Sequence, residues 1–202
     1  ITALDAITNG DNNVAIGYNS AADITTGNNN VAVGADSLFK LQTNNLNTAV
    51  GSTSGYNTTG SNNSAFGVGA LGTNTTGAQN TAVGYEAASS CSTTNYHTCI
   101  GFRAGRDIST GEGNTLLGYN CGQNISTGAA NTAVGVGSLE GNTTAAYNVG
   151  LGFYALRCNT TGCKNTAVGT STLYKSTTGI RNSAMGGNAL SENTTGGYNL
   201  SL

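Results

Sequence analysis

The stretch Asn74–Gly84 reads NTTGAQNTAVG, and close copies of it recur along the chain. Each copy joins an Asn-Thr-Thr, an acceptor pattern for an N-linked sugar, to a short apolar run that ends in glycine. The copies therefore belong either to a glycosylated polar tether or to a folded repeat. Disorder usually combines low hydrophobicity with high net charge, whereas this 202-residue chain has 8% charged residues and a net charge of −2. We therefore expect a fold.

The copies recur with a nearly constant period. The pattern Asn-x-Ala-apolar-Gly begins every 17 residues, except for one interval of 16 residues between Asn47 and Asn63. Numbered from that asparagine, the unit reads N-T-A-V-G-Y-x-A-L-x-x-N-T-T-G-x-x. In this frame Asn80 is at position 1 and Asn74 is at position 12 of the preceding unit. A short fixed period of this kind is typical of solenoids.

The composition of the unit indicates strands rather than helices. β-Branched Thr, Val and Ile lie between glycine corners, and two packed helices would need more residues and fewer than the 31 glycines present. We predict an all-β fold, a parallel β-solenoid (β-roll) of about twelve 17-residue coils. Residues 1–202 form one array, which we expect to be a fragment of a longer fibre. The strand spacing predicts a rod about 55–60 Å long.

The frame also predicts which side chains face water. All seven basic and nine acidic residues fall at positions 7, 10, 11, 16 and 17, so these positions should face outward. Position 4 is apolar in every copy, and we expect it to point inward together with position 9. Position 3, usually alanine, must then face outward, because successive strand residues face opposite ways. This small, uncharged column predicts that another chain packs against it, unless the roll's own loops cover that face.

Two positions are rich in glycine. Position 5 is glycine in every complete copy and position 15 in most copies. We expect turns with positive φ or close backbone approach at both.

The Asn-Thr-Thr asparagines share position 12 with isoleucines. We therefore expect them to be half-buried corner residues that stack as a hydrogen-bonded ladder, rather than sugar sites. They are Asn57, Asn74, Asn142, Asn159 and Asn193. Asn62 and Asn124 are the better candidates for glycosylation, because charged residues occupy their frame positions in other copies.

Three segments carry a resemblance to known fibres: NVAIGYNSAA (Asn13–Ala22), NVAVGADSL (Asn30–Leu38) and NTAVGYEAA (Asn80–Ala88). They resemble the head-domain repeats of trimeric autotransporter adhesins, and the Asn-Thr-Thr-Gly part is similar to repeats of phage tail fibres and bacterial surface fibres. The resemblance implies a left-handed parallel β-roll with three chains side by side, projecting from a surface and binding host matrix. This frame is longer than that of the adhesin heads, which also usually lack cysteines.

Little in the chain indicates catalysis. GVGALG (Gly67–Gly72) matches a dinucleotide-binding fingerprint, but it is the ordinary frame with glycines at positions 5, 7 and 10 and no βαβ pattern around it. One histidine and no paired carboxylates leave no general acid–base pair. We expect no enzyme activity and no cofactor. The weak charge argues against nucleic acid as a partner, and no run of about 18 apolar residues exists to span a membrane.

The five cysteines leave three interpretations open. Cys158 and Cys163 bracket one corner and Cys91 and Cys99 bracket another, so each pair is a candidate disulfide, which would imply an oxidising compartment. The thiols are alternatively small core residues. The third alternative is a metal site formed by Cys91, His97 and Cys99, with Cys121 nearby, although this spacing matches no standard zinc signature.

Two columns are candidate binding surfaces. Tyr85, Phe102 and Tyr119 occupy position 6 in consecutive copies and should stack as a surface stripe, which either holds a sugar or partner or shields the coil edge. Position 14 is almost always threonine, a single column of the kind that could match an ice lattice or simply satisfy corner backbone groups.

Together these features favour an extracellular structural and adhesive fibre on a cell surface or virion. We expect it to assemble with copies of itself, as a homotrimer or filament, and to present its variable outward residues to host or matrix glycans or proteins. The alternative is an ice-binding or carbohydrate-binding β-solenoid module.

Overall fold

A computed structural model describes residues 2–202 of the chain, and within that range it shows the predicted all-β solenoid. The described residues form twelve short strands and no helix. In all but the last coil the strand has three residues, at frame positions 2–4. The strands are β1 (Val14–Ile16), β2 (Val31–Val33), β3 (Thr48–Val50), β4 (Ser64–Phe66), β5 (Thr81–Val83), β6 (Thr98–Ile100), β7 (Thr115–Leu117), β8 (Thr132–Val134), β9 (Val149–Leu151), β10 (Thr166–Val168), β11 (Ser183–Met185) and β12 (Leu200–Ser201).

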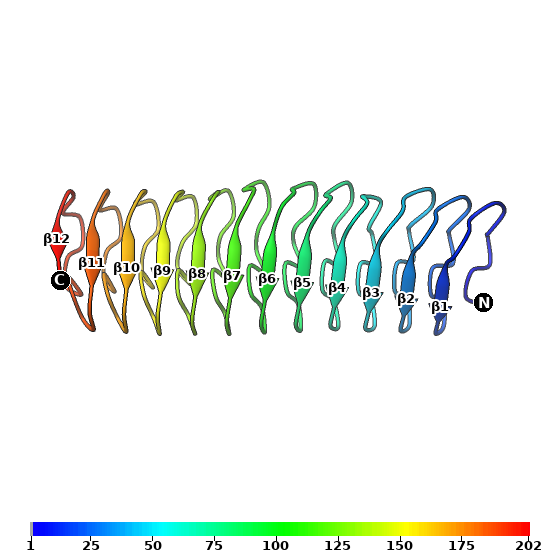
Figure 1. Cartoon of the computed structure of the whole chain (residues 1–202), viewed down its shortest axis with the longest axis horizontal. Coiled ribbons are helices and arrows are strands. Elements are labelled where there is room, and N and C mark those ends of the chain that lie inside the picture. Colours follow the sequence, from blue (N-terminus) through cyan, green and yellow to red (C-terminus); the bar gives the residue numbers. More distant parts are fainter. Residues whose placement is uncertain (1) are drawn as a thin grey trace.

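All twelve strands lie in one parallel sheet, in the order in which they occur in the sequence. Each residue pairs with the residue at the same frame position in the next coil, as Thr81 does with Thr98 and Val83 with Ile100. The 16-residue coil keeps this register, since Thr48 pairs with Ser64. Figure 1 shows the result, a row of similar coils with the N-terminus at one end and the C-terminus at the other.

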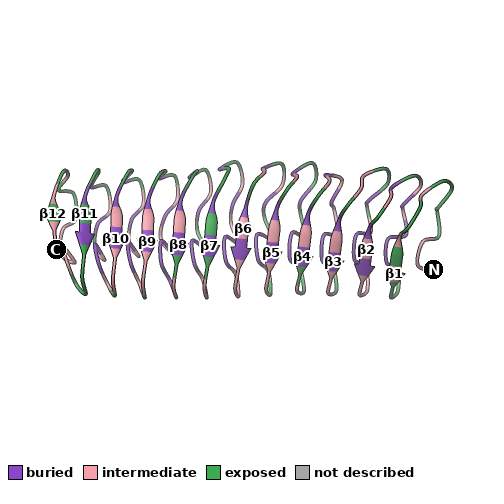
Figure 2. Ribbon diagram, viewed as in Figure 1, coloured by how far each residue is buried: buried purple, intermediate pink, exposed green. Residues whose placement is uncertain are grey.

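The strands face the opposite way from our expectation. The middle residue, position 3, is buried, as at Ala82 and Ala133, whereas position 4 lies outside, with Leu117 44% exposed (Figure 2). The prediction that position 4 points inward and position 3 outward was therefore wrong. The asparagine side chain of position 1 is buried, and residues two apart in an extended segment face the same side. Position 3 therefore points into the core together with position 1.

The core is thin and is filled by three more inward positions besides position 3. Position 9 is buried, as predicted, at residues such as Leu38 and Leu139. Position 12 adds Ile24 and Ile108, and position 8 adds small residues such as Ala87. Each coil therefore contributes only a few apolar side chains, and the stacking of neighbours supplies most of the burial.

One coil shows how closely this core is packed. Position 3 is Leu116 there instead of alanine, and position 9 is Gly122 instead of leucine. A Cβ added to Gly122 would lie 2.7 Å from Cδ2 of Leu116 and 2.9 Å from Cδ1 of Ile125. The glycine therefore leaves space for the large residue at position 3.

Position 1 forms the asparagine ladder that we had expected at position 12. The Oδ1 atom of Asn131 accepts from the backbone N–H of Asn148 at 3.0 Å and from its Nδ2 at 3.2 Å. Nδ2 of Asn131 donates to Oδ1 of Asn114 at 3.0 Å and to the carbonyl of Ala145, at position 15 of its own coil, at 2.9 Å. Similar bonds recur along the rod.

The position 12 asparagines are buried corners, but they form no ladder between coils. Asn74, Asn142 and Asn159 are buried, as expected. Their amides bond within their own coil, as Nδ2 of Asn74 does to the carbonyl of Gly77 at 3.0 Å. Asn57 lies at position 11 and does not belong to this set. In its 16-residue coil Thr58 is the buried corner residue, and its backbone N–H donates to the carbonyl of Gly55. The residue missing from this coil is therefore at position 14.

The glycines at position 5 meet two demands at once. Gly34 has a φ of 128°, and a Cβ added to it would lie 2.6 Å from the carbonyl carbon of Gly51 in the next coil. Positions 7, 9 and 17 are also left-handed but hold other residues, such as Leu139 with a φ of 53°. Both demands therefore reserve position 5 for glycine: a φ near 130° lies outside the αL region that Leu139 occupies, and the next coil leaves no space for a Cβ.

We predict that substituting Leu116 and Gly122 together destabilises the rod by less than the sum of the two single substitutions. Leu116→Ala leaves a cavity and should cost about 2–5 kcal/mol, and Gly122→Leu overfills the coil and should cost about 1–3 kcal/mol. The double variant recreates the alanine–leucine pair of Ala133 and Leu139. Urea unfolding should give it a smaller loss than the sum of the single losses by at least about 1 kcal/mol. Additive losses would show that the two residues do not share this space.

Candidate functional site

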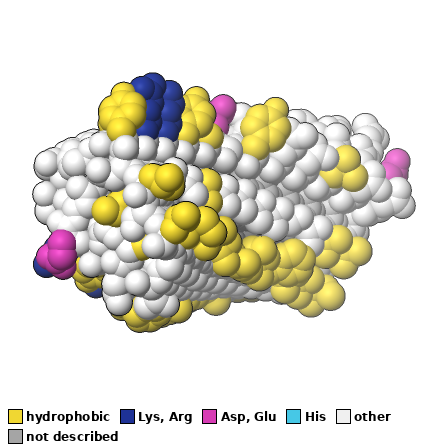
Figure 3. Space-filling view, turned by 60° about the vertical axis from the view of Figure 1, so that its left-hand side comes forward, with side chains coloured by type: hydrophobic (Ala, Val, Ile, Leu, Met, Phe, Trp, Pro, Cys, Tyr) yellow, Lys and Arg dark blue, Asp and Glu magenta, His cyan; other side chains and the backbone are white. Residues whose placement is uncertain are grey.

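The outward strand residues form a face that we call the sheet face, made of positions 2 and 4. Position 4 supplies an apolar column along the rod, in which Ile16 is 61% and Met185 51% exposed. The column is Ile16, Val33, Val50, Phe66, Val83, Ile100, Leu117, Val134, Leu151, Val168, Met185 and Leu202. Position 2 runs beside it with threonine, serine, valine and leucine. Figure 3 shows a band of hydrophobic side chains running along the rod.

Charged side chains lie away from the sheet face, at the outward positions that the frame predicted. Most of the ion pairs join the same frame position in neighbouring coils: Arg103 binds Glu86 at 2.8 Å, and Lys175 binds Glu192 at 2.7 Å. Exposed pairs of this kind contribute little stability. Their arrangement leaves the sheet face uncharged.

The aromatic stripe stacks as predicted. The ring centroids of Tyr85 and Phe102 are 5.3 Å apart, those of Phe102 and Tyr119 are 5.1 Å apart, and the Arg103 guanidinium lies 4.9 Å from the Phe102 centroid. Stacking covers the inner ring faces. The face of Tyr119 toward the following coil has no ring against it, because Val136 takes position 6 there.

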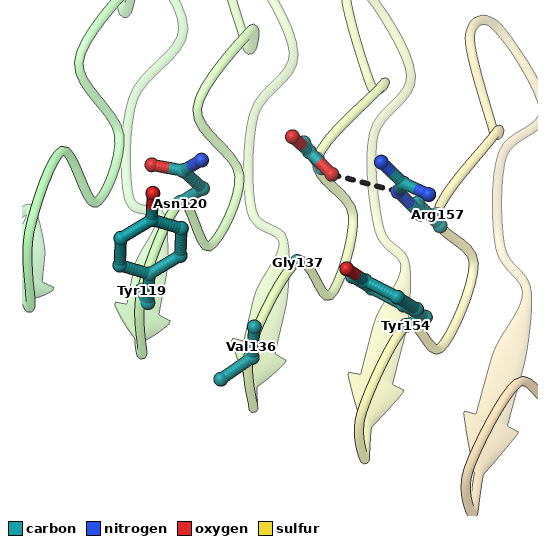
Figure 4. A pocket seen from close by; sticks show the side chains of 7 residues that line it. Tyr119, Asn120, Val136, Gly137, Tyr154 and Arg157 are labelled. Carbon is teal, nitrogen blue, oxygen red and sulfur yellow. Dashed lines mark hydrogen bonds and ion pairs between the residues drawn. The ribbon is translucent and has the colours of Figure 1, made fainter.

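A small cavity lies at that end of the stripe, and we call it the notch (Figure 4). It measures about 170 Å³ and is lined by Tyr119, Asn120, Val136, Gly137, Glu140, Tyr154 and Arg157. Figure 4 shows the Tyr119 and Tyr154 rings on either side of Val136 and Gly137, with the Arg157 side chain beside Tyr154. A more open hollow, lined in part by Asn124 and Cys158, lies against the same Glu140 and Arg157.

All five cysteines are free thiols, so neither Cys158 with Cys163 nor Cys91 with Cys99 forms the predicted disulfide. Cys91, Cys99 and Cys121 are buried at positions 12, 3 and 8, where other coils carry core residues. Cys121 donates to the Ala133 carbonyl at 3.3 Å, as the Ser138 hydroxyl does to Gly150 at 2.9 Å. Burial raises the pKa of Cys121 to about 12. These three thiols are small core residues.

Within residues 2–202 no three His, Cys, Asp or Glu side chains are grouped so that they could hold a metal ion. The candidate set of Cys91, His97 and Cys99 is therefore not assembled into a site.

Two asparagines of acceptor sequences are exposed, Asn62 and Asn124, as the frame predicted. Asn57 and Asn193 are half-buried, whereas the other three corner asparagines are inside. Accessibility therefore favours Asn62 and Asn124 as acceptors.

His97 replaces asparagine in the ladder of position 1. Its backbone N–H donates to Oδ1 of Asn80 at 3.0 Å, and its Nδ1 accepts from the N–H of Asn114 at 3.3 Å. Its Nε2 is 3.0 Å from the Thr94 hydroxyl. Burial lowers the pKa of His97 to about 4, against which nearby Glu112 acts only in part. The ring is therefore neutral in the folded chain at neutral pH.

This histidine should make the rod less stable in mild acid. Because the pKa of His97 is about 4 in the folded chain and near 6.5 when exposed, the unfolded chain takes up the proton first as the pH falls. The free energy of unfolding should therefore drop by about 3 kcal/mol between pH 6.5 and pH 4 and then level off. His97→Asn should remove this component in parallel urea titrations. Equal pH profiles for both proteins would refute the assignment.

No helix among the described residues is long and apolar enough for a membrane crossing. Comparison with protein-family models, with curated proteins and with solved structures finds no match for this chain.

Proposed function

We propose that the chain is a structural segment of an extracellular adhesive fibre, and that it associates side by side with copies of itself through the sheet face. The observation that carries this proposal is the apolar column at position 4, which lies outside the coil. Contiguous exposed apolar patches of more than a few hundred Å² are typical of interaction surfaces. With twelve strands about 4.8 Å apart, this face extends over roughly 50 Å.

A second copy is the occupant that fits this face best. The face repeats at every coil and carries no charged side chain, so only a surface with the same coil spacing can contact it equally well along its whole length. The side chains are short and mostly β-branched, which suits two sheets packed face to face about 10 Å apart. Another solenoid of this sequence supplies both features.

The remaining outward positions support the adhesive part of the proposal. Positions 6, 7, 10 and 11 differ from coil to coil and hold the aromatic stripe, the ion pairs and the notch. Most of the charged side chains lie at these positions, while position 4 of the sheet face stays apolar in every copy. A rod whose coils stack in the same way throughout can present these variable outward side chains to host or matrix glycans or proteins.

Ice binding is a second candidate, favoured by one observation. The sheet face presents a column at position 2, in which half of the residues are threonine, beside the apolar column of position 4, so that two regular columns share one face. Position 14 adds a separate exposed threonine column, as at Thr127 and Thr144. Thermal hysteresis of a monomeric protein, lost in Thr115→Arg/Thr132→Arg, would support this candidate against the fibre.

Self-association can be tested with two matched double variants. Leu117→Arg/Val134→Arg places two charges on the sheet face of adjacent coils, whereas Thr127→Arg/Thr144→Arg places the same charges at position 14 of the same coils. Light scattering should show an oligomer for the wild type and the position 14 control. The sheet-face variant should approach the 20.1 kDa monomer with unchanged circular dichroism, because burying guanidinium groups there is unfavourable.

Three results would contradict the proposal: a wild-type monomer, an oligomer that survives the sheet-face substitutions, or equal dissociation of the two variants.

A further inference from the structure

The notch arises because two short residues are adjacent in one coil. At position 6, Tyr85, Phe102 and Tyr119 stack, and then Val136 breaks the column. At position 7, Gly137 lies between Asn120 and Tyr154 of the neighbouring coils. A hollow one coil wide is left, with the Tyr119 ring, which is 52% exposed, on one side.

The opposite side of the notch is held in place by several contacts. The Tyr154 ring leans over Gly137, so that a Cβ added there would lie 2.5 Å from two ring carbons. The Arg157 guanidinium lies 4.3 Å from the Tyr154 centroid, and its Nε donates to Oε2 of Glu140 at 2.8 Å. Arg157 Nη1 also donates to the Tyr174 hydroxyl at 3.0 Å. The hydrogen bond to Glu140 raises the pKa of Arg157, so the guanidinium stays charged.

The notch thus combines an uncovered aromatic face with a polar rim. Asn120 offers an amide, Glu140 a carboxylate and Arg157 further N–H donors, and Val136 adds an apolar side chain to the lining. Because Glu140 and Arg157 neutralise each other, the rim presents hydrogen-bonding groups without a net charge. Neither anions nor cations are favoured by such a rim.

We propose that the notch binds the pyranose ring of a neutral sugar. One face of a pyranose is largely C–H and stacks on an aromatic ring, while its equatorial hydroxyls both donate and accept hydrogen bonds. The cavity of about 170 Å³ is smaller than the roughly 300 Å³ at which sites for drug-sized ligands begin, so it suits one ring of a glycan. With so few contacts, a methyl glycoside should bind with a dissociation constant on the order of 1 mM.

This site is independent of the proposed self-association. The notch uses positions 6, 7 and 10, whereas the sheet face uses positions 2 and 4. Sugar binding deepens the adhesive part of the fibre proposal and rests on it, whereas sugar binding and self-association can each fail without the other. It also places recognition at the end of the aromatic stripe rather than along it, where neighbouring rings already cover one another.

The test uses saturation-transfer NMR and titration calorimetry with the methyl glycosides of glucose, galactose, mannose and N-acetylglucosamine. At least one should bind the wild-type chain, with saturation strongest on the protons of one ring face. Val136→Phe should abolish binding, because it continues the stack from Tyr119 and fills the notch. Phenylalanine already occupies position 6 at Phe102 and Phe153, so this variant should keep the wild-type melting temperature.

Two controls complete the design. Val136→Thr preserves the shape of the notch and should keep the wild-type affinity. Tyr18→Ala removes an exposed tyrosine at position 6 of a distant coil and should also leave binding unchanged, whereas Tyr119→Ala should weaken it at least tenfold.

The proposal is overturned if none of the four glycosides binds. It is also overturned if Val136→Phe, folded by circular dichroism, binds as the wild type does, or if Tyr18→Ala loses affinity to the same extent as Tyr119→Ala.

Discussion

The buried amide of frame position 1 is the interaction on which the rest of the rod depends. It joins each coil to the preceding one through Oδ1 of the preceding asparagine, and it closes its own coil through the carbonyl at position 15. One side chain thus links neighbouring coils in a fixed register and closes a corner of its own coil. Left without partners inside the core, the same groups would cost free energy, so a coil cannot slip by one residue without loss.

The inward amide of position 1 also determines which strand side chains face the core. Once position 1 points inside, position 3 must also point inside, and positions 2 and 4 must face out. Alanine suits position 3 because the leucine of position 9 fills the same narrow space. The apolar residues of position 4 then lie on the surface, and the free energy of burying them remains available for association. The exposed apolar face on which the fibre proposal rests is therefore a consequence of how the coil closes.

Much of the fold could be predicted from the sequence because the same frame position can be compared in many copies of the repeat. Twelve copies located the corners, the charged positions, the inward leucines and the stacking of Tyr85, Phe102 and Tyr119. The prediction of which strand positions face the core was wrong because apolar residues are usually inside and asparagine usually outside. The near-invariance of asparagine at position 1 was the signal that could have corrected it.

Features that depend on how side chains of several neighbouring coils lie in space could not be predicted from the repeat pattern alone. The notch exists only because Val136 and Gly137 lie between Tyr119 and Tyr154 in space, and each residue alone is ordinary for its position. The cysteine pairs were inferred from residues that bracket a corner in sequence. In the structure Cys91 and Cys99 occupy separate core positions, and Cys158 and Cys163 are half-buried free thiols.

The central claim is that the position 1 amides hold the coils together, and unfolding of two asparagine variants tests it most directly. Asn131→Ala removes the acceptor of the Asn148 N–H and the donor to the Ala145 carbonyl, whereas Asn124→Ala changes an exposed asparagine in the preceding coil. Urea titration should give Asn131→Ala a loss of about 3 kcal/mol or more and Asn124→Ala a loss within about 0.5 kcal/mol. Equal, small losses for both variants would contradict the account, because the ladder would then be a by-product of coil stacking and not its cause.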